Sequence, residues 1–295
     1  MLRVVRRESP LADEALVRTA AGWETSGVAT EQIRRELADE LWESEHSRKP
    51  IEPLTRRYPD LAVTDAYAIQ SLNVSRHLSG GARLVGRKVG LTSLPMQRLL
   101  GVDEPDFGVL LDHMATEDGD EVPLGRLVQP RIEAEIALVM ERDLEGPGVT
   151  AARALTAIAG ALPALEIVDS RVAGWEIKLI DTIADNASSA MFVVGGNIRP
   201  LTAIDPRLIG VVVSRNGALA DTGAGAAALG NPVRCVAWLA NKLAAFGDGL
   251  HAGDIVLPGA VHTMIPVAPG DAFRAEFAHL GSVTVRFSAD RESRA

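Results

Sequence analysis

The sequence predicts an α+β protein in which a small helical region is followed by a larger mixed, mainly antiparallel β region. Apolar residues recur at helical spacing in the first part of the chain. From about residue 82 onward, short apolar and alternating runs are separated by turn residues, and few helical stretches stand between them. We therefore expect a helical region over residues 1–80 and a β domain over residues 81–295. Residues 1–29 show no clear pattern, and the two alternatives for them are a loose extension and a misassigned start.

The first expected helix begins after Thr30. The hydroxyl of this residue can accept a hydrogen bond from a free backbone N–H of the first turn. Ile33, Leu37 and Leu41 then recur every four residues and form one apolar face. Residues 49–63 contain three prolines and are expected to form a loop.

A second helix is expected to begin after Thr64, which can act as its N-terminal cap. Ile69 and Leu72 share one face of this helix. The pair Gly80-Gly81 is expected to end it, because glycine is favoured just beyond the last turn of a helix.

The middle of the chain predicts strands at residues 83–90 and 131–140. Between Thr150 and Leu162 the apolar spacing predicts an amphipathic helix. A further strand is expected to start at Pro163 and to run through the sequence PALEIVDS.

The last third predicts two hairpins and one helix. The first hairpin covers residues 208–223, and its Asn216-Gly217 pair is typical of a type I′ turn. Asn231-Pro232 supplies a cap and a first-turn proline for a helix that is expected to end at Gly247. The second hairpin turns at His279–Gly281.

Composition excludes several classes of function. The chain has 30 lysine and arginine residues against 39 aspartate and glutamate residues, a net charge of −9, and no basic cluster. It is therefore not expected to bind nucleic acid or an anionic membrane. No apolar run approaches the length of a membrane span, and no apolar segment follows the basic start, so neither a span nor a signal peptide is expected. The single cysteine, Cys235, fits a reducing cytoplasm.

Two glutamates in the strand RIEAEIALVM are candidate metal ligands. Successive side chains of a strand alternate between its faces, so Glu133 and Glu135 share one face, while Ile132 and its alternate neighbours form an apolar face. Two residues along a strand span roughly 6.6 Å, from which two glutamate side chains can bend onto one ion. A solvated strand face is the alternative explanation.

Glu166 favours the metal site. It lies within an apolar, strand-like run, where an unpaired carboxylate is costly to bury. Three glutamates from two strands would form an oxygen-only site suited to Mg²⁺ or Mn²⁺. Such a cation would also allow an acidic protein to bind a small anionic substrate.

Three further segments contain candidate functional residues. Lys88 lies among glycines and apolar residues; the alternative is an exposed strand lysine. Asp106 lies in the sequence EPDFG, which a plain turn also explains. Residues 181–190 are rich in small hydrogen-bonding groups, as in a capped turn. The chain contains no G-x-S-x-G, G-x-x-x-x-G-K-[ST] or H-E-x-x-H motif.

Taken together, these segments resemble the 2-keto-4-pentenoate hydratase (2-hydroxypenta-2,4-dienoate hydratase) family of the fumarylacetoacetase-like superfamily. The resemblance runs from about residue 30 to about residue 287. The matching stretches are GRKVGLTS (86–93), LGVDEPDFGVLL (100–111), RIEAEIALV (131–139), PALEIVDSR (163–171), DTIADNASSA (181–190) and LGNPVRCVAWLANKL (229–243).

The resemblance implies roles for six residues. It places the ligands of a divalent metal, Mg²⁺ or Mn²⁺, at Glu133, Glu135 and Glu166. It implies acid–base roles for Lys88 and Asp106. Lys88 would supply a positive charge and a donor near the enolate oxygen, or shuttle a proton if the dry pocket and the ion lower its pKa. Ser189 is expected to bind the substrate. The last ligand is a glutamate, whereas acylpyruvate hydrolases of the superfamily more often have aspartate there, so that branch is disfavoured.

The implied fold is the fumarylacetoacetase-like β domain, with residues 81–295 as the catalytic part. The implied reaction is the addition of water to 2-hydroxypenta-2,4-dienoate or a close homologue, giving a 4-hydroxy-2-oxo acid in aromatic or steroid catabolism. The alternatives are a 4-oxalocrotonate decarboxylase and a non-catalytic partner subunit. The resemblance also implies a cytoplasmic homo-oligomer that could associate with neighbouring pathway enzymes.

Overall fold

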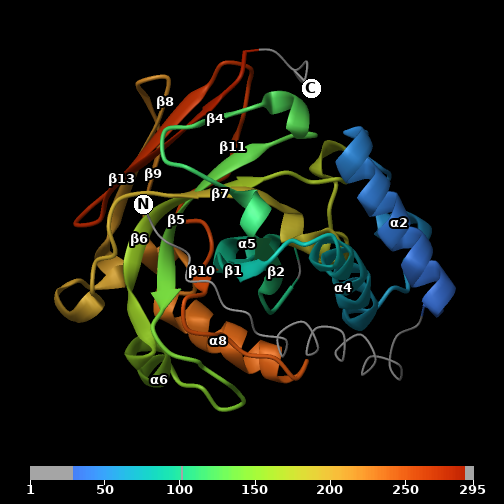
Figure 1. Ribbon diagram of the computed structural model, residues 1–295, viewed down its shortest axis with the longest axis horizontal. Coiled ribbons are helices and arrows are strands. Elements are labelled where there is room, and N and C mark those ends of the chain that lie inside the picture. The colour runs from blue at the N-terminus through green and yellow to red at the C-terminus, as the bar shows by residue number, and fades with distance from the viewer. Residues whose placement is uncertain (1–28, 101, 290–295) are drawn as a thin grey trace.

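The computed structural model describes residues 29–100 and 102–289 (Figure 1). Most of the expected extension over residues 1–29 therefore lies outside the described residues. In Figure 1 the helices α2 and α4 lie together at one side of the molecule, and strands β8, β9 and β13 lie at the other. No helix in the described ranges is long and apolar enough to cross a membrane.

Three helices open the described chain: α2 (Glu31–Ser47), α3 (Leu54–Arg57) and α4 (Val63–Ser79). The expected cap of α2 is confirmed, since the Thr30 hydroxyl accepts a hydrogen bond from the Ile33 N–H at 3.3 Å. The loop expected over residues 49–63 contains α3, a single turn of helix between two of its prolines.

The expected cap of α4 is wrong. Thr64 lies inside the helix, and the N-cap is Ala62. The Asp65 carboxylate accepts a hydrogen bond from the Ala62 N–H at 2.9 Å, so a carboxylate in the first turn performs the capping. Asp65 also forms a buried ion pair with Arg34 at 2.8 Å and so ties α4 to α2.

The larger sheet is mixed and mainly antiparallel, as expected. Its order is β2-β1-β10-β5-β6-β7-β3, with β11 also paired to β5. Only the pairs β1–β10 and β3–β7 are parallel. Its strands are β1 (Leu84–Gly90), β2 (Asp106–Leu111), β3 (Ala115–Thr116), β5 (Arg131–Met140), β6 (Ile158–Val168), β7 (Ser189–Val194), β10 (Ile255–Leu257) and β11 (Ile265–Pro266).

The smaller sheet has the order β4-β13-β12-β8-β9. Both expected hairpins are present in it, β8–β9 and β12–β13. Asn216 and Gly217 have φ values of 54° and 80°, as a type I′ turn requires. The strands are β4 (Glu121–Val122), β8 (Gly210–Arg215), β9 (Ala218–Ala224), β12 (Ala272–Phe277) and β13 (Gly281–Phe287).

Helix α6 (Ala151–Thr156) is much shorter than the helix expected between Thr150 and Leu162. Strand β6 begins at Ile158 instead of Pro163, because residues 158–162 pair with the end of β5. This long-range pairing outweighs the local helical spacing. The other elements are α5 (Leu94–Leu100), α7 (Leu179–Ala184) and α8 (Pro232–Ala244), and the short 3₁₀ turns η1 (Asp112–Met114), η2 (Leu124–Arg126), η3 (Ala173–Trp175), η4 (Asn186–Ser188), η5 (Leu201–Ala203), η6 (Pro206–Leu208) and η7 (Gly225–Ala227).

Strand β5 separates two apolar cores. The alternate residues that begin with Ile132 face the larger core, which also contains side chains from α2, α4, α8 and the smaller sheet. Ala137 faces a smaller core formed with residues of β2, β6 and β7. Glu133 and Glu135 alternate in register with Ala137, so they lie on the side of the smaller core, as the sequence predicts.

The Arg34–Asp65 pair should contribute strongly to stability. Asp65→Asn leaves the buried guanidinium without its counter-charge and should lower the free energy of unfolding by about 3–5 kcal/mol, measured by urea denaturation. Glu31→Gln breaks the exposed ion pair with Arg35 on the same helix and should change the free energy of unfolding by less than about 1 kcal/mol. Equal losses in the two variants would show that the buried pair does not anchor α2 to α4.

Candidate active site

The antiparallel pairing of β5 and β6 brings three glutamates together. Glu133 lies directly opposite Glu166, and Glu135 lies two residues further along the same face of β5. One oxygen from each carboxylate lies within 4.8 Å of the other two. Oxygens that share one Mg²⁺ or Ca²⁺ lie roughly 2.0–2.6 Å from the ion, so the spacing of this acidic cluster fits a single divalent cation.

Each of the two fully buried glutamates has one oxygen held by the protein and one oxygen free of hydrogen bonds. Glu135 Oε2 accepts a hydrogen bond from the Gly259 N–H at 2.7 Å, and Glu166 Oε1 accepts one from the Ser189 hydroxyl at 2.8 Å. Glu135 Oε1 and Glu166 Oε2 accept no hydrogen bond from any described residue. Buried oxygens without a donor are suited to a cation.

The electrostatics of the acidic cluster also favour a cation. Burial, together with the neighbouring carboxylates of Glu166 and Asp106, raises the pKa of Glu133 to about 7. Burial and the charges of Glu166 and Glu133 raise the pKa of Glu135 well above its ordinary value. A divalent cation would offset the repulsion and stabilise the charged form of all three carboxylates.

Lys88 extends from β1 toward the acidic cluster. Its Nζ donates a hydrogen bond to the Ala187 carbonyl at 3.0 Å and lies 3.4 Å from Glu166 Oε2. The side chain is 4% exposed, so the alternative of an exposed strand lysine is wrong. Burial lowers the pKa of Lys88, but the carboxylates of Glu166 and Glu133 outweigh it, and the pKa lies above its ordinary value. Lys88 is therefore a fixed cation, not a lysine with the lowered pKa that a dry pocket alone would produce.

Asp106 is the first residue of β2 and lies opposite Gly90 of β1. A Cβ at Gly90 would lie 2.1 Å from Asp106 Oδ1, so only glycine allows the carboxylate to take this position. Asp106 is fully buried, and the Thr182 side chain is the hydrogen-bonding neighbour that lowers its pKa. Burial raises the pKa of Asp106 in spite of the nearby Lys88, as suits a group that exchanges a proton.

Ser189, at the start of β7, lies next to the acidic cluster. Its hydroxyl donates to Glu166, so in this structure it orients a candidate metal ligand. A contact with substrate stays a prediction for this residue. The structure thus brings all six predicted residues into one site.

Two backbone groups of the site escaped the sequence analysis. The Gly259 N–H holds Glu135 across 124 positions of the chain, and the Ala187 carbonyl holds Lys88 across 99 positions. Gly259 has a φ of +109°, and a Cβ there would lie 1.9 Å from the Thr92 hydroxyl. The only local signal was the small-residue composition of residues 181–190, which does not specify a partner.

The chain is similar to a known family of enzymes and to several proteins named as hydratases. Residues 82–288 match the family described as fumarylacetoacetate (FAA) hydrolase C-terminal. The chain is 47% identical over 262 residues to a 2-keto-4-pentenoate hydratase of Paraburkholderia xenovorans (strain LB400), covering 89% of this chain and 97% of that protein. It is 41% identical to a 2-hydroxyhexa-2,4-dienoate hydratase of Comamonas testosteroni over 250 residues, 84% of this chain and 95% of that protein.

Among solved structures, the 4-oxalocrotonate decarboxylase from Pseudomonas putida G7 complexed with magnesium and adipate superposes with a TM-score of 0.86. It is 37% identical, and the match covers 89% of this chain and all of that one. The chain belongs to the 2-keto-4-pentenoate hydratase family of the fumarylacetoacetase-like superfamily, which confirms the resemblance seen in its sequence.

Binding of a divalent cation should stabilise the fold. At a free Mn²⁺ concentration of 100 times Kd, the free energy of unfolding should rise by about 2.7 kcal/mol, seen as a higher Tm in a thermal melt. Glu135→Gln should remove most of this shift while raising the stability of the metal-free protein, because it removes one repelling buried charge. Glu276→Gln, at an exposed position of β12, is the control and should keep the full Mn²⁺ shift. A full shift in Glu135→Gln would exclude this residue as a ligand.

Proposed function

We propose that the protein is a metal-dependent hydro-lyase that adds water to 2-hydroxypenta-2,4-dienoate or a close homologue and yields a 4-hydroxy-2-oxo acid. The observation that carries this proposal is the buried acidic cluster with Lys88 and Asp106 beside it. It lies in a chain whose curated relatives are named hydratases at 41–48% identity.

Glu133, Glu135 and Glu166 would hold the metal, which we propose to be Mg²⁺ or Mn²⁺. Their donors are all carboxylate oxygens, which these hard cations prefer. When bound, the cation supplies a Lewis acid for a chelating carboxylate and 2-oxygen. The named complex of the decarboxylase with magnesium supports the same assignment here.

Lys88 would stabilise the negative charge that develops on the substrate's 2-oxygen. Its ammonium group is buried and is oriented by the Ala187 carbonyl, which leaves further N–H donors for a substrate oxygen. A positive charge fixed in a dry site stabilises an enolate oxygen without reorganisation. Lys88 therefore favours loss of the 2-hydroxyl proton to give the dienolate, and addition of one proton at the far carbon of that dienolate then produces an α,β-unsaturated 2-oxo acid.

Asp106 would act on the water molecule that adds at C4. Its carboxylate is buried and has a pKa raised by that burial, so it can take a proton from water and return it to the product. The nearby Lys88 charge acts against this rise and favours the ionised carboxylate, which is the form that serves as a base. Ser189, whose O–H donates to Glu166, would accept a hydrogen bond from the substrate with its hydroxyl oxygen.

A second candidate is decarboxylation of 4-oxalocrotonate, favoured by the structural match at 37% identity. It would use the same chelated 2-oxo acid but release CO₂ instead of adding water. The curated relatives favour the hydratase, since their sequence identities to this chain, 47% and 41%, exceed the 37% of the decarboxylase. Measuring CO₂ release beside the loss of dienoate absorbance separates the two reactions.

A non-catalytic partner subunit is disfavoured, because Lys88 and the three glutamates are present and clustered.

We also propose the setting of the enzyme. Residues 81–295 would form the catalytic domain and residues 1–80 an N-terminal helical region. The protein would work in the cytoplasm, in aromatic or steroid catabolism, as a homo-oligomer that can associate with neighbouring pathway enzymes. The names of its relatives support the catabolic role, and the single Cys235 suits a reducing cytoplasm.

Turnover should depend on a divalent metal. Incubation with 2-hydroxypenta-2,4-dienoate and Mg²⁺ should remove the dienoate absorbance, EDTA should abolish the reaction, and Mn²⁺ or Mg²⁺ should restore it. Glu135→Ala should remain folded but inactive with either ion, because a ligand is lost. Near-normal turnover after chelation would contradict the metal role.

Lys88→Met should reduce kcat by roughly 100-fold or more in the same assay, as expected for the loss of an acid–base or charge-stabilising group. Lys49→Met, at an exposed position before α3, removes the same charge far from the acidic cluster and should retain normal turnover. If both variants turn over equally, Lys88 has only a structural role.

A further inference from the structure

We propose that Asn186 is a positioning residue. Its side-chain amide makes the two hydrogen bonds that a neighbouring strand would make with the edge strand β2, and these bonds hold the segment 185–189 beside the acidic cluster. From there the segment brings the Ala187 carbonyl to Lys88 and the Ser189 hydroxyl to Glu166. For its catalytic consequence the inference rests on the proposed hydratase function.

The backbone of this segment has an uncommon conformation. Asn186, Ala187 and Ser188 have φ values of 52°, 51° and 53°, three left-handed residues in succession and none of them glycine. L-residues seldom adopt this conformation, and a run of three persists only where surrounding contacts impose it. Such imposed strain is typical of functional sites.

The amide of Asn186 supplies one set of these contacts. Its Oδ1 accepts from the Val109 N–H at 2.8 Å, and its Nδ2 donates to the Val109 carbonyl at 3.0 Å. Val109 lies on β2, the terminal strand of the larger sheet, opposite Arg87 of β1. In an antiparallel strand the N–H and C=O of one residue point to the same side, so a neighbouring strand would normally satisfy both. Here one side chain does so.

Close approach of the two backbones depends on Gly108. A Cβ at this position would lie 2.5 Å from the Asn186 carbonyl oxygen. Because Asp106 lies two residues before Gly108 on the same strand, the contact also fixes the distance between Asp106 and the segment that holds Lys88.

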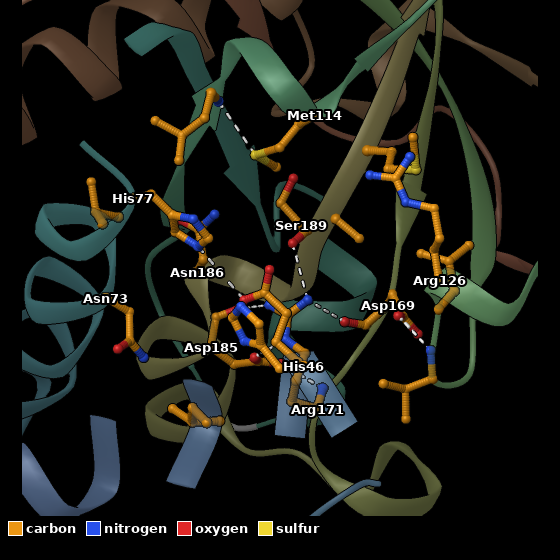
Figure 2. Close-up of a pocket in the computed structure, with 18 of the residues that line it drawn as sticks. His46, Asn73, His77, Met114, Arg126, Asp169, Arg171, Asp185, Asn186 and Ser189 are labelled. Carbon is orange, nitrogen blue, oxygen red and sulfur yellow. Dashed lines mark hydrogen bonds and ion pairs between the residues drawn. The ribbon is translucent and has the colours of Figure 1, made fainter. Parts of the chain in front are cut away.

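The other face of the segment is held by Arg171. Its guanidinium donates to the Asp185 carbonyl at 2.6 Å and to the Ser189 carbonyl at 3.1 Å, the residues that flank the left-handed turn. Figure 2 shows Arg171, Asp185, Asn186 and Ser189 gathered at the wall of a cavity. Arg171 therefore clamps both ends of the segment, and Asn186 fixes its middle.

The segment borders a cavity. Asp185, Asn186 and Ser189 line this space of about 150 Å³ together with residues of α2 and α4 (Figure 2). The two hydrogen bonds between the Asn186 amide and Val109 can be removed by substitution without introducing a larger side chain.

The experiment compares Asn186→Asp with Asn241→Asp. Asn241 on α8 makes the same pair of bonds, to the N–H and carbonyl of Val149, away from the acidic cluster. In both variants a carboxylate oxygen replaces the amide N–H and faces a carbonyl. Asn186→Gly is the second variant, because it removes the amide while permitting the left-handed φ. Gly108→Ala is the third, because it leaves Asn186 intact but pushes its backbone away.

The readouts are kcat and KM for 2-hydroxypenta-2,4-dienoate, the Mn²⁺ Kd by electron paramagnetic resonance, and the urea midpoint. We expect the two aspartate variants to lose similar stability. The variants at positions 186 and 108 should lose roughly 10–100-fold in kcat or Mn²⁺ affinity, the usual effect of disturbing groups that orient metal ligands. Asn241→Asp should keep the kcat and the Mn²⁺ affinity of the unmodified protein.

Two outcomes separate this inference from the proposed function. If the folded variants at positions 186 and 108 match Asn241→Asp within twofold in kcat and in Mn²⁺ Kd, the positioning role is overturned. If the unmodified protein does not turn over the dienoate, the proposed function fails instead. The Mn²⁺ Kd then decides the positioning role alone, and an unchanged value in the folded variants overturns it.

Discussion

Repulsion among buried carboxylates is the constraint on which the site depends. Glu133, Glu135, Glu166 and Asp106 are grouped around the single ammonium of Lys88. Their charges exceed that of one lysine, and the interior provides little screening. The raised pKa values of Glu133 and Asp106 show the cost of grouping these carboxylates. A divalent cation removes the excess negative charge, so the arrangement is suited to metal binding more than to a stable metal-free fold.

The fold maintains this unfavourable grouping through extended pairing and backbone contacts. Strand β5 pairs with β6 along its whole length, so Glu133 and Glu166 remain opposite each other unless the core of the sheet opens. Most of the groups that orient the charged side chains belong to the backbone, including the Gly259 N–H and the Ala187 carbonyl. The positions of the charged groups therefore depend on the backbone around Gly259 and Ala187 and on the β5–β6 pair as much as on the side chains themselves.

Local patterns predicted the parts of this site that local geometry determines. The alternation of β5 placed Glu133 and Glu135 on one face, and the apolar surroundings of Glu166 indicated a partner for its charge. The helix expected over residues 150–162 was wrong because pairing with β5, distant in sequence, extends β6 through residues that also suit a helix. The cap of α4 was wrong because Asp65, not Thr64, bonds to the helix start. Contacts such as Lys88 with Ala187 have no local pattern, so no spacing rule could reveal them.

The same physical logic explains how one fold can serve both hydratases and decarboxylases. A chelated 2-oxo acid needs only a metal and a fixed positive charge to stabilise negative charge at its 2-oxygen, and both reactions develop charge there. They differ in what happens at the far end of the substrate, where water must be activated or a carboxylate must be lost. Asp106, a buried carboxylate beside Lys88, suits the activation of water. The curated relatives, named hydratases at 41–48% identity, favour a dienoate over 4-oxalocrotonate as the substrate of this site.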